Sequence, residues 1–387
     1  MNLSFIKYFF SYTFKSRTRQ KLLFLSVVGL LISSFSLMVV QGIMGGLQSG
    51  LVARSKTVLG SATLEILDKP QVDIKEISSL LLKNNIKFVP EYEIELMIQG
   101  TTYVKPIILH GLDFETYMPE FLADKDTDHI VLGSGLGRDL RSYFGSKLIV
   151  TSPSHTTLVF TQIPRRATSF VSDYYSSELP EIDGIHGWVR LAFIQNLIRK
   201  REINKFRIYD SSLRNIENVM NDNNFQFLKL VTWEDKNATL VWALGLETKV
   251  MLFLFIGMSF LIGICIISGF LIFYNKIKVD LSSFWILGMS RDKMMKLIFI
   301  YGQLLSFIFS ILGVLLGIGF LSLLQSENLV IMPEHFVERN IPVKMDIISI
   351  LISLGIPYLF ATVFTYITFK LFKNENFSFL SLIKKVG

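Results

Sequence analysis

The sequence has one cysteine among 387 residues, so no part of the chain can fold around an internal disulfide. This residue, Cys265, lies in an apolar run, which predicts a small buried side chain. Charge is also missing from four long apolar runs, residues 22–44, 250–274, 297–324 and 347–369, which contain no Asp, Glu, Lys or Arg. Because proton and ion pathways through membranes usually need such groups, an ion-driven transporter is disfavoured.

Several motifs of enzymes and metal proteins are absent as well. Residues 133–137 (Gly-Ser-Gly-Leu-Gly) lack both the Gly-Lys-Ser/Thr ending of a phosphate loop and the spacing of the dinucleotide fingerprint, so they predict a turn leading into a short helix. No Gly-x-Ser-x-Gly nucleophile setting occurs. The histidines at 110, 129, 155 and 186 lack paired metal-ligand spacing, which predicts ordinary surface or core side chains. We expect the chain to be no enzyme and to bind no cofactor or metal.

The chain is too apolar for an ordinary soluble domain and too charged to lie wholly within a membrane. Hydrophobic residues make up 50% of it, and the mean hydropathy is +0.45. The net charge of +7 comes from basic residues that cluster beside the apolar runs. Retention of Lys and Arg at the cytoplasmic face explains this placement, so no nucleic-acid partner is required.

The apolar runs are long enough to cross a bilayer as helices, since about 20 residues suffice. The predicted spans are residues 22–44, 248–274, 297–324 and 347–369. Residues 1–21 interleave aromatic and basic side chains and predict an amphipathic helix along the cytoplasmic interface. A signal peptide is the alternative, but the run after it is longer than a usual signal core, and no clear small-x-small cleavage site follows.

Charge placement orients these spans. Basic residues before Leu22 keep the first end in the cytoplasm, so residues 45–247 form a large block outside it. Residues 325–346 are poor in basic side chains and predict an outside loop, whereas residues 370–387 form a basic cytoplasmic tail. Both termini are therefore expected in the cytoplasm.

The block between the first two spans mixes strand and helix patterns. Runs bounded by turn residues predict strands at 62–67, 104–109, 147–151, 157–161, 205–209 and 227–232. Helical spacing appears at 74–83, 191–200 and 213–220. The predicted fold class is an α-helical membrane protein with four transmembrane helices plus a large α+β extracytoplasmic domain between helices 1 and 2, and the mixture argues against a barrel.

The connector between the second and third spans, residues 275–296, is basic and therefore expected in the cytoplasm. Its middle, residues 281–287, is apolar and predicts a short helix broken at Gly288. An apolar patch on a short loop needs a covering surface, which is either lipid headgroups or a soluble partner. We interpret it as the place where a cytoplasmic motor grips the membrane part; a basic loop lying on anionic lipid is the alternative.

Two features of the later spans concern packing. Small residues recur at three- or four-residue spacing in the third span, which predicts a contact stripe with another helix or subunit: Ser306, Ser310, Gly313 and Gly317. Gly355 and Pro357 predict a bend in the fourth span.

The order of these segments resembles the permease subunits of type VII ABC transporters, and within them the lipoprotein-releasing permeases LolC and LolE. Residues 44–48 (Met-Gly-Gly-Leu-Gln) and 58–60 are similar to the family's segment at the outer end of the first span. Residues 232–235 (Thr-Trp-Glu-Asp), with Asn237 and residues 243–249, resemble its path into the second span. The likeness covers nearly the full chain.

Residues 280–290 look like the family's coupling segment, although Trp285 and Ile286 replace an Arg and a Thr. The resemblance implies a bacterial inner-membrane permease with a periplasmic domain, partnered by a cytosolic LolD-like ATPase dimer that binds the ATP and Mg²⁺. It also implies a second permease subunit, either a paralogue or a second copy. The residues implied in ATPase coupling are Asp280, Leu281, Phe284, Leu287, Gly288 and Ser290.

Two further sites follow from the resemblance. Residues 163–166 are similar to the tip of the hairpin hook with which LolC-type subunits hold a LolA-like periplasmic chaperone: Ile163, Pro164, Arg165 and Arg166. The cargo implied is a triacylated lipoprotein whose acyl chains enter between the first two spans. The candidate cavity lining is Met38, Val40, Ile43, Met44, Met251, Leu254 and Phe255.

Two other functions remain open on the sequence. The first is a MacB- or FtsX-like mechanotransmission permease with a different substrate, or one that activates a cell-wall hydrolase without transport. The second is a membrane-anchored sensor, which would need a cytoplasmic output module that the residues after Lys370 leave little room for.

Overall fold

The structure is a computed structural model that describes residue 9 and residues 21–67, 74–158, 162–209, 213–222, 227–326 and 342–374. The chain divides into two compact units. The helical unit comprises Met1–Ser49 and Ala243–Gly387, and the sheet domain comprises Gly50–Trp242. The predicted segments 1–21, 325–346 and 370–387 therefore fall largely outside the described residues, as do residues 159–161 of one predicted strand.

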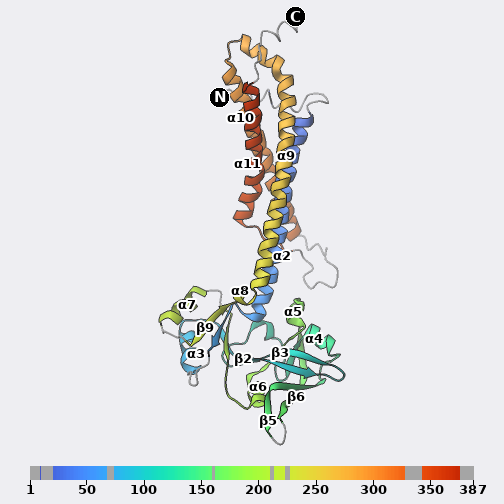
Figure 1. Ribbon diagram of the computed structural model, residues 1–387, viewed down its shortest axis with the longest axis vertical. Helices are drawn as coiled ribbons and strands as arrows, with labels where there is room; N and C mark the ends of the chain where they lie inside the picture. Colours follow the sequence, from blue (N-terminus) through green and yellow to red (C-terminus); the bar gives the residue numbers. More distant parts are fainter. Residues whose placement is uncertain are drawn as a thin grey trace. The chain divides into compact units, whose positions relative to one another are not determined.

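Within the described residues, four helices are long and apolar enough to cross a membrane (Figure 1). They are α2 (Lys21–Leu59), α9 (Ala238–Ile286), α10 (Arg291–Ser326) and α11 (Ile347–Asn374). The predicted apolar runs lie inside them. One expectation is wrong: residues 281–286 form no separate short helix, because α9 continues without interruption from the apolar run to Ile286.

Hydrogen bonds and small residues join these helices. Ser26 of α2 donates to the carbonyl of Cys265 in α9 at 2.9 Å, and the Ser33 and Ser259 hydroxyls lie 3.4 Å apart, so the two helices run antiparallel. Cys265 itself is exposed in the chain, which corrects its predicted burial, because its side chain lies away from this contact.

The small-residue stripe of α10 packs against α2. A Cβ on Gly313 would lie 2.4 Å from the carbonyl oxygen of Leu31, and a Cβ on Gly317 would lie 2.9 Å from the Cβ of Met38. Ser306 and Ser310 on the same stripe are buried. This agrees with the predicted contact stripe between helices. The helix α11 continues through Pro357.

The part of the sheet domain that the structure describes contains nine strands in one mixed sheet (Figure 1). They are β1 (Ala62–Ile66), β2 (Phe88–Gln99), β3 (Val104–Leu112), β4 (Ile130–Gly133), β5 (Lys147–Leu158), β6 (Gln162–Tyr175), β7 (His186–Arg190), β8 (Lys205–Ile208) and β9 (Leu228–Thr232). Their order is β3-β7-β4-β6-β5-β2-β8-β1-β9, and β2 also pairs with β3. Six of these strands therefore form a closed ring, because β2 pairs with β3 as well as with β5 and β8 at different positions along its length. This differs from the prediction, which argued against a barrel.

Short helices cover this sheet. They are α3 (Ile74–Lys83), α4 (Ser134–Asp139), α5 (Pro180–Asp183), α6 (Leu191–Ile198), α7 (Leu213–Asp222) and α8 (Trp233–Lys236), with a 3₁₀ turn at Glu120–Leu122. One apolar core fills the six-strand ring, where alternate residues such as Leu96, Ile98 and Leu109 are buried against Ile194 of α6. A second core lies under α3 and α7, around Phe88 and Phe206.

Candidate functional site

The turn between α9 and α10 presents an apolar tip. α9 ends at Ile286, and Gly288 adopts φ +91°, a left-handed conformation that glycine accommodates easily. The backbone N–H groups of Lys293 and Met294 both donate to the carbonyl of Ser290, which starts α10. Leu287 is 81% exposed at the tip, and Ile286 beside it is 64% exposed. The resemblance placed ATPase coupling in this segment.

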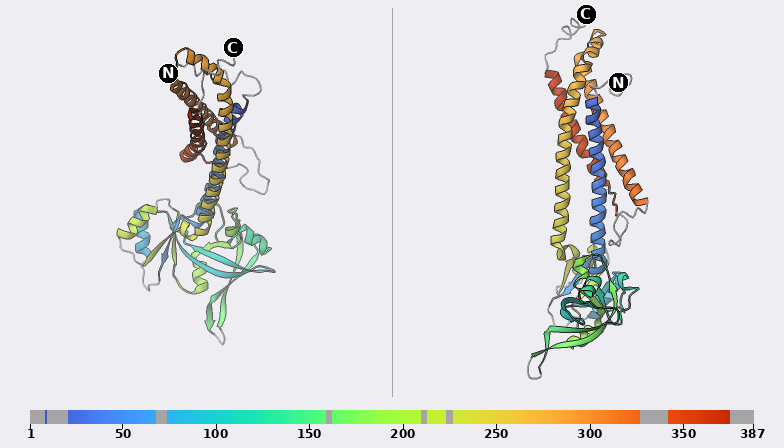
Figure 2. Two further views of the ribbon diagram at one scale, coloured as in Figure 1. Left: turned by 45° about the horizontal axis from the view of Figure 1, so that its top comes forward. Right: turned by 90° about the vertical axis from the view of Figure 1, so that its right-hand side faces the viewer.

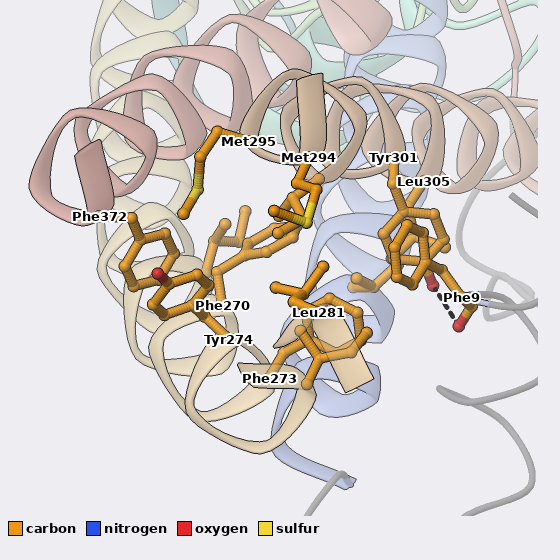
Figure 3. Packing of buried hydrophobic residues seen from close by; sticks show 14 of the residues in the cluster. Phe9, Phe270, Phe273, Tyr274, Leu281, Met294, Met295, Tyr301, Leu305 and Phe372 are labelled. Atoms are coloured by element: carbon orange, nitrogen blue, oxygen red, sulfur yellow. Dashed lines mark hydrogen bonds between the residues drawn. The ribbon is translucent and has the colours of Figure 1, made fainter. Parts of the chain in front are cut away.

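Beneath this tip, the turn is fixed by a buried core (Figure 3). Leu281 is fully buried, and Phe284 packs against the same core. The core collects side chains from several helices: Phe9, Val27, Leu30, Phe270, Phe273, Tyr274, Met294, Met295, Tyr301, Leu305 and Phe372. The rings of Tyr274 and Phe372 stack with centroids 3.7 Å apart, and the Tyr301 hydroxyl donates to the Phe9 carbonyl at 3.4 Å. A force on the tip therefore acts on one packed body rather than on a loose loop.

The predicted coupling residues therefore differ in burial. Leu281 and Phe284 point into the core, whereas Leu287 points outward beside the glycine turn. The backbone of Asp280 lies within α9, and its side chain lies outside the description.

A cavity of about 200 Å³ lies between α2, α9 and α11. Four of the seven predicted lining residues face it: Val40, Met44, Met251 and Phe255. The other three do not. Met38 is fully buried against Val314 and Leu321 of α10, Ile43 packs against that same cluster, and Leu254 is 60% exposed on the outer side of α9. Helical periodicity explains the split, since residues three apart on α9 face in different directions by about 60°.

Polar groups line one end of this cavity. Gln48 of α2 donates to the Glu247 carboxylate at 3.2 Å and lies 3.4 Å from the Thr248 hydroxyl of α9. The side-chain oxygen of Gln41, also in the lining, is buried and has no hydrogen-bond partner among the described residues. The two segments quoted for the family resemblance, 44–48 and 243–249, are thus brought into contact.

Another segment quoted for that resemblance, residues 232–235, forms a junction with the end of α2. Thr232 and Asp235 cap α8 reciprocally, which fixes the chain direction before α9. The indole N–H of Trp233 donates to the Ser55 hydroxyl at 2.8 Å, and Lys56 pairs with Glu234 at 2.7 Å. These contacts fasten α2 and α8 to each other inside the sheet domain.

The hairpin of β5 and β6 forms a long two-stranded arm (Figure 2). Ile163 pairs with Thr157 and Pro164 with Thr156, so these residues lie in β6, whereas the prediction placed them at the tip of the hairpin. Their part in holding a chaperone stays a prediction. Pro164 is tolerated there because the outer edge of β6 has no strand partner at this point in the described part of the chain. Arg165 donates to the Ile198 carbonyl of α6, whereas Arg166 is exposed.

A buried polar network, which spacing did not reveal, crosses four strands of the sheet domain. It consists of Glu91, Glu93, His110, His186 and Arg207. The Arg207 guanidinium donates to both oxygens of Glu91, at 2.5 Å and 2.8 Å. His110 Nδ1 lies 2.5 Å from Glu91, and its Nε2 lies 2.6 Å from Nδ1 of His186. Registers β2–β3 and β3–β7 place these side chains on one face, a long-range pairing that no local motif encodes.

Glu91, Glu93 and His110 offer three ligand atoms within 4.8 Å of one another, which is close enough to hold a metal ion. The centre of this group is already occupied by a cation. Arg207 Nη2 lies 2.8 Å from Glu91, 3.1 Å from Glu93 and 3.3 Å from His110 Nδ1. Lys205 also pairs with Glu93 at 2.7 Å, so two carboxylates face two basic side chains. The donor set therefore does not fit a divalent metal.

The electrostatics of the network keep both carboxylates ionised. Burial acts to raise the pKa of Glu91, but Arg207 and His110 hold it far below its ordinary value. Burial likewise opposes ionisation of Glu93, and His110 with Arg207 and Lys205 lowers its pKa to about 2. Burial, followed by the neighbouring His110, lowers the pKa of His186 to about 3, so this ring is neutral at pH 7.

Together, these features describe a chain with four candidate membrane helices and a mixed-sheet domain among its described residues. No known protein family matches the sequence, and no curated protein matches it. Among solved structures, the chain is similar to the periplasmic region of MacB from Actinobacillus actinomycetemcomitans, at 10% identity and a TM-score of 0.29. The match covers 49% of this chain and 97% of that one.

Proposed function

We propose that this chain is the permease subunit of an ATP-driven ABC transporter of the MacB/FtsX-like kind. A cytosolic ATPase dimer binds ATP and Mg²⁺ and grips the tip around Leu287. The chain itself carries out no hydrolysis and relays the movement of the ATPase to its extracytoplasmic domain.

One observation carries this proposal. An exposed apolar tip, Ile286 and Leu287, stands at the end of an apolar membrane helix and is built on a core shared with α2, α10 and α11. A loop that only rested on lipid would need no such rigid support. A tip that transmits force needs both an exposed surface for the motor and a stiff body beneath it.

We further propose that the substrate is a triacylated lipoprotein, as in LolC and LolE, and that the β5–β6 arm passes it to a LolA-like chaperone. The cavity between α2, α9 and α11 supports an acyl chain as ligand, since Val40, Met44, Met251 and Phe255 give it apolar walls. Extraction requires ATP because each buried CH₂ holds an acyl chain in the membrane with about 0.8 kcal/mol.

The small volume of the cavity also supports a second function. Its volume of about 200 Å³ is below the roughly 300 Å³ of ordinary ligand pockets, so one chain alone does not enclose three acyl chains. Either a second permease subunit completes the site, or the chain moves a different substrate or activates a cell-wall hydrolase.

Reconstitution with a LolD-like ATPase and a second permease subunit separates these functions. Vesicles that carry a triacylated lipoprotein are expected to release it to a soluble LolA-like chaperone only when ATP is present. ATP hydrolysis that is coupled to the complex but unaffected by lipoprotein and chaperone would favour the second function. Absence of any coupled ATPase would overturn the permease proposal.

The cavity is tested by photo-crosslinking in the same vesicles. A photoreactive residue at Met251, which lines the cavity, is expected to capture lipoprotein during turnover. The matched control is Leu254, one turn away on the exposed side of α9. Equal capture at the two positions would show that the cavity does not hold the cargo.

A further inference from the structure

A further cavity, of about 250 Å³, lies within the sheet domain and shares no lining residue with the one between α2, α9 and α11. Its lining comes from the end of α2 and the turn after it, from the residues that flank β2 and β8, and from the segment at the 3₁₀ turn. The lining residues are Ala53, Lys56, Thr57, Ser61, Lys87, Tyr117, Glu120 and Tyr209. Charged, hydroxyl and aromatic groups therefore face one space.

Strand pairing places Lys87 and Tyr209 side by side in this lining. Phe88 pairs with Ile208, and the backbone N–H of Tyr209 donates to the Lys87 carbonyl at 2.9 Å. Residues directly opposite each other on antiparallel strands carry their side chains on the same face, with Cβ atoms about 5 Å apart. The ring of Tyr117 completes the group, since its centroid lies 5.8 Å from that of Tyr209 and 6.0 Å from Lys87 Nζ. One ammonium and two phenol rings thus form a cluster.

This cluster offers two hydrogen-bond donors to an acid group. The Lys87 ammonium lies over the Tyr117 ring and has no carboxylate within ion-pair distance among the described residues. The Tyr209 hydroxyl donates to the Val58 carbonyl at 3.5 Å, the outer limit of a hydrogen bond, so an acceptor in the cavity would bind this hydrogen more closely. Burial raises the pKa of Tyr209, which keeps its hydroxyl protonated. A carboxylate fits this position because it accepts from an ammonium and a hydroxyl at once.

The cavity also presents one carboxylate. Glu120 begins the 3₁₀ turn, is exposed, and has no basic side chain within ion-pair distance among the described residues. Lys56, the other cation of the lining, pairs with Glu234 at 2.7 Å. Lys87 and Glu120 therefore face the same space as opposite charges that do not pair with each other. Glu120 would repel a ligand with two negative charges, whereas a ligand with one acid group and one ammonium group is complementary to both side chains.

The volume and the aromatic wall define the rest of the ligand. About 250 Å³ is below the roughly 300 Å³ of pockets for drug-sized ligands, so the ligand is small. Tyr117 packs partly against the core around Trp188, and the remainder of its ring gives the cavity an apolar surface. We propose that this cavity binds a free α-amino acid with an apolar side chain: its carboxylate accepts from Lys87 and Tyr209, its ammonium pairs with Glu120, and its side chain contacts Tyr117.

The test is the binding of L-phenylalanine and L-leucine to the full chain in an uncharged detergent, measured by isothermal titration calorimetry. We expect saturable binding of both. Phenylpropionate lacks the ammonium group and phenethylamine lacks the carboxylate, so each is expected to bind roughly tenfold or more weakly than phenylalanine, as loss of one charge-assisted interaction predicts. Absence of saturable binding by both amino acids would overturn the proposal, as would binding of either analogue with the affinity of phenylalanine.

Variants of the two unpaired charges locate the site. Lys87→Met is expected to weaken binding of phenylalanine roughly tenfold or more, and Lys87→Arg, which keeps the cation, is expected to retain it. Glu120→Gln is expected to remove the preference for phenylalanine over phenylpropionate. The matched control is Lys83→Met, at an exposed lysine in the last turn of α3. Wild-type affinity in Lys87→Met, or an equal loss in Lys83→Met, would refute the assignment of the cavity.

A lipid headgroup is the other source of such a pair of charges. Glycerophosphoethanolamine carries one phosphate charge and one ammonium group, so it is used as a competitor in the same titration. Phenylalanine binding that persists in its presence supports a free amino acid as the ligand. Displacement of phenylalanine by this competitor would assign the cavity to a phospholipid headgroup and overturn the proposal.

Discussion

Single residues fix how the first membrane helix ends in the sheet domain. α2 stops at Leu59, and Gly60 follows with φ +75°, a left-handed conformation that caps the helix. A Cβ on Gly60 would lie 2.6 Å from the carbonyl oxygen of Ile208, which accepts a hydrogen bond from Ser61. The turn thus requires glycine for two separate reasons, conformation and space.

Replacing Gly60 with Ala is therefore expected to lower the free energy of unfolding by about 2–3 kcal/mol, since the backbone cost of about 1–2 kcal/mol adds to a clash with a fixed carbonyl. Thermal unfolding of the chain in detergent, followed by near-UV circular dichroism, measures it. The matched control is Gly145→Ala, where φ is +76° but nothing lies within 4 Å. Equal losses in the two variants would show that the contact with Ile208 is unimportant.

The polar network also shows what residue-level reasoning misses. No strand was predicted at residues 88–99, and the histidines looked scattered along the chain. In the structure these side chains meet partners such as Arg207, over a hundred positions away, through strand pairing. Only the register of a sheet brings them together, and one sequence does not reveal that register.

At the scale of secondary-structure elements, the sequence predicted those helices and strands whose own residues carry a clear helical or strand pattern. The helix at 74–83 and the strands beginning at 62 and 104 were expected and occur as α3, β1 and β3. β2, β4, β6 and β7 were not expected. β4 and β7 are only four and five residues long, and polar residues interrupt β6. In β2, apolar residues do alternate with glutamates, a strand signal that the prediction missed. In α9 the apolar run predicted the core of the helix but not its 49-residue length, since polar residues beyond the run continue the helix.

The stripe on α10 gives a prediction about helix packing. Gly313→Leu is expected to separate α10 from α2, because the side chain would enter the backbone of Leu31. We expect a lower midpoint of thermal unfolding and less crosslinking between cysteines placed on the two helices in a Cys265→Ser background. Gly319→Leu is the control, since nothing lies within 4 Å of that position. An unchanged Gly313→Leu variant would contradict close packing along this stripe.

For the molecule as a whole, the tip at Leu287 is the decisive surface of the proposed function. Leu287→Asp is expected to weaken binding of the ATPase by roughly tenfold to a hundredfold, the effect of losing about 1.5–3 kcal/mol of apolar burial. Co-purification and ATP-dependent transport measure the loss. Leu82→Asp is the matched control, because Leu82 is similarly exposed, at 58%, on α3 of the sheet domain. Normal binding and transport by Leu287→Asp would remove the tip from the mechanism.

The absence of any interruption in α9 before Ile286 has a mechanical meaning. A flexible connector between the surface that an ATPase contacts and a membrane helix would absorb part of each displacement before the helix moved. In the proposed mechanism the ATPase acts on the turn that directly follows α9, so a displacement at Leu287 would pass to a helix braced by the rings of Phe273 and Tyr274 with no flexible segment between them.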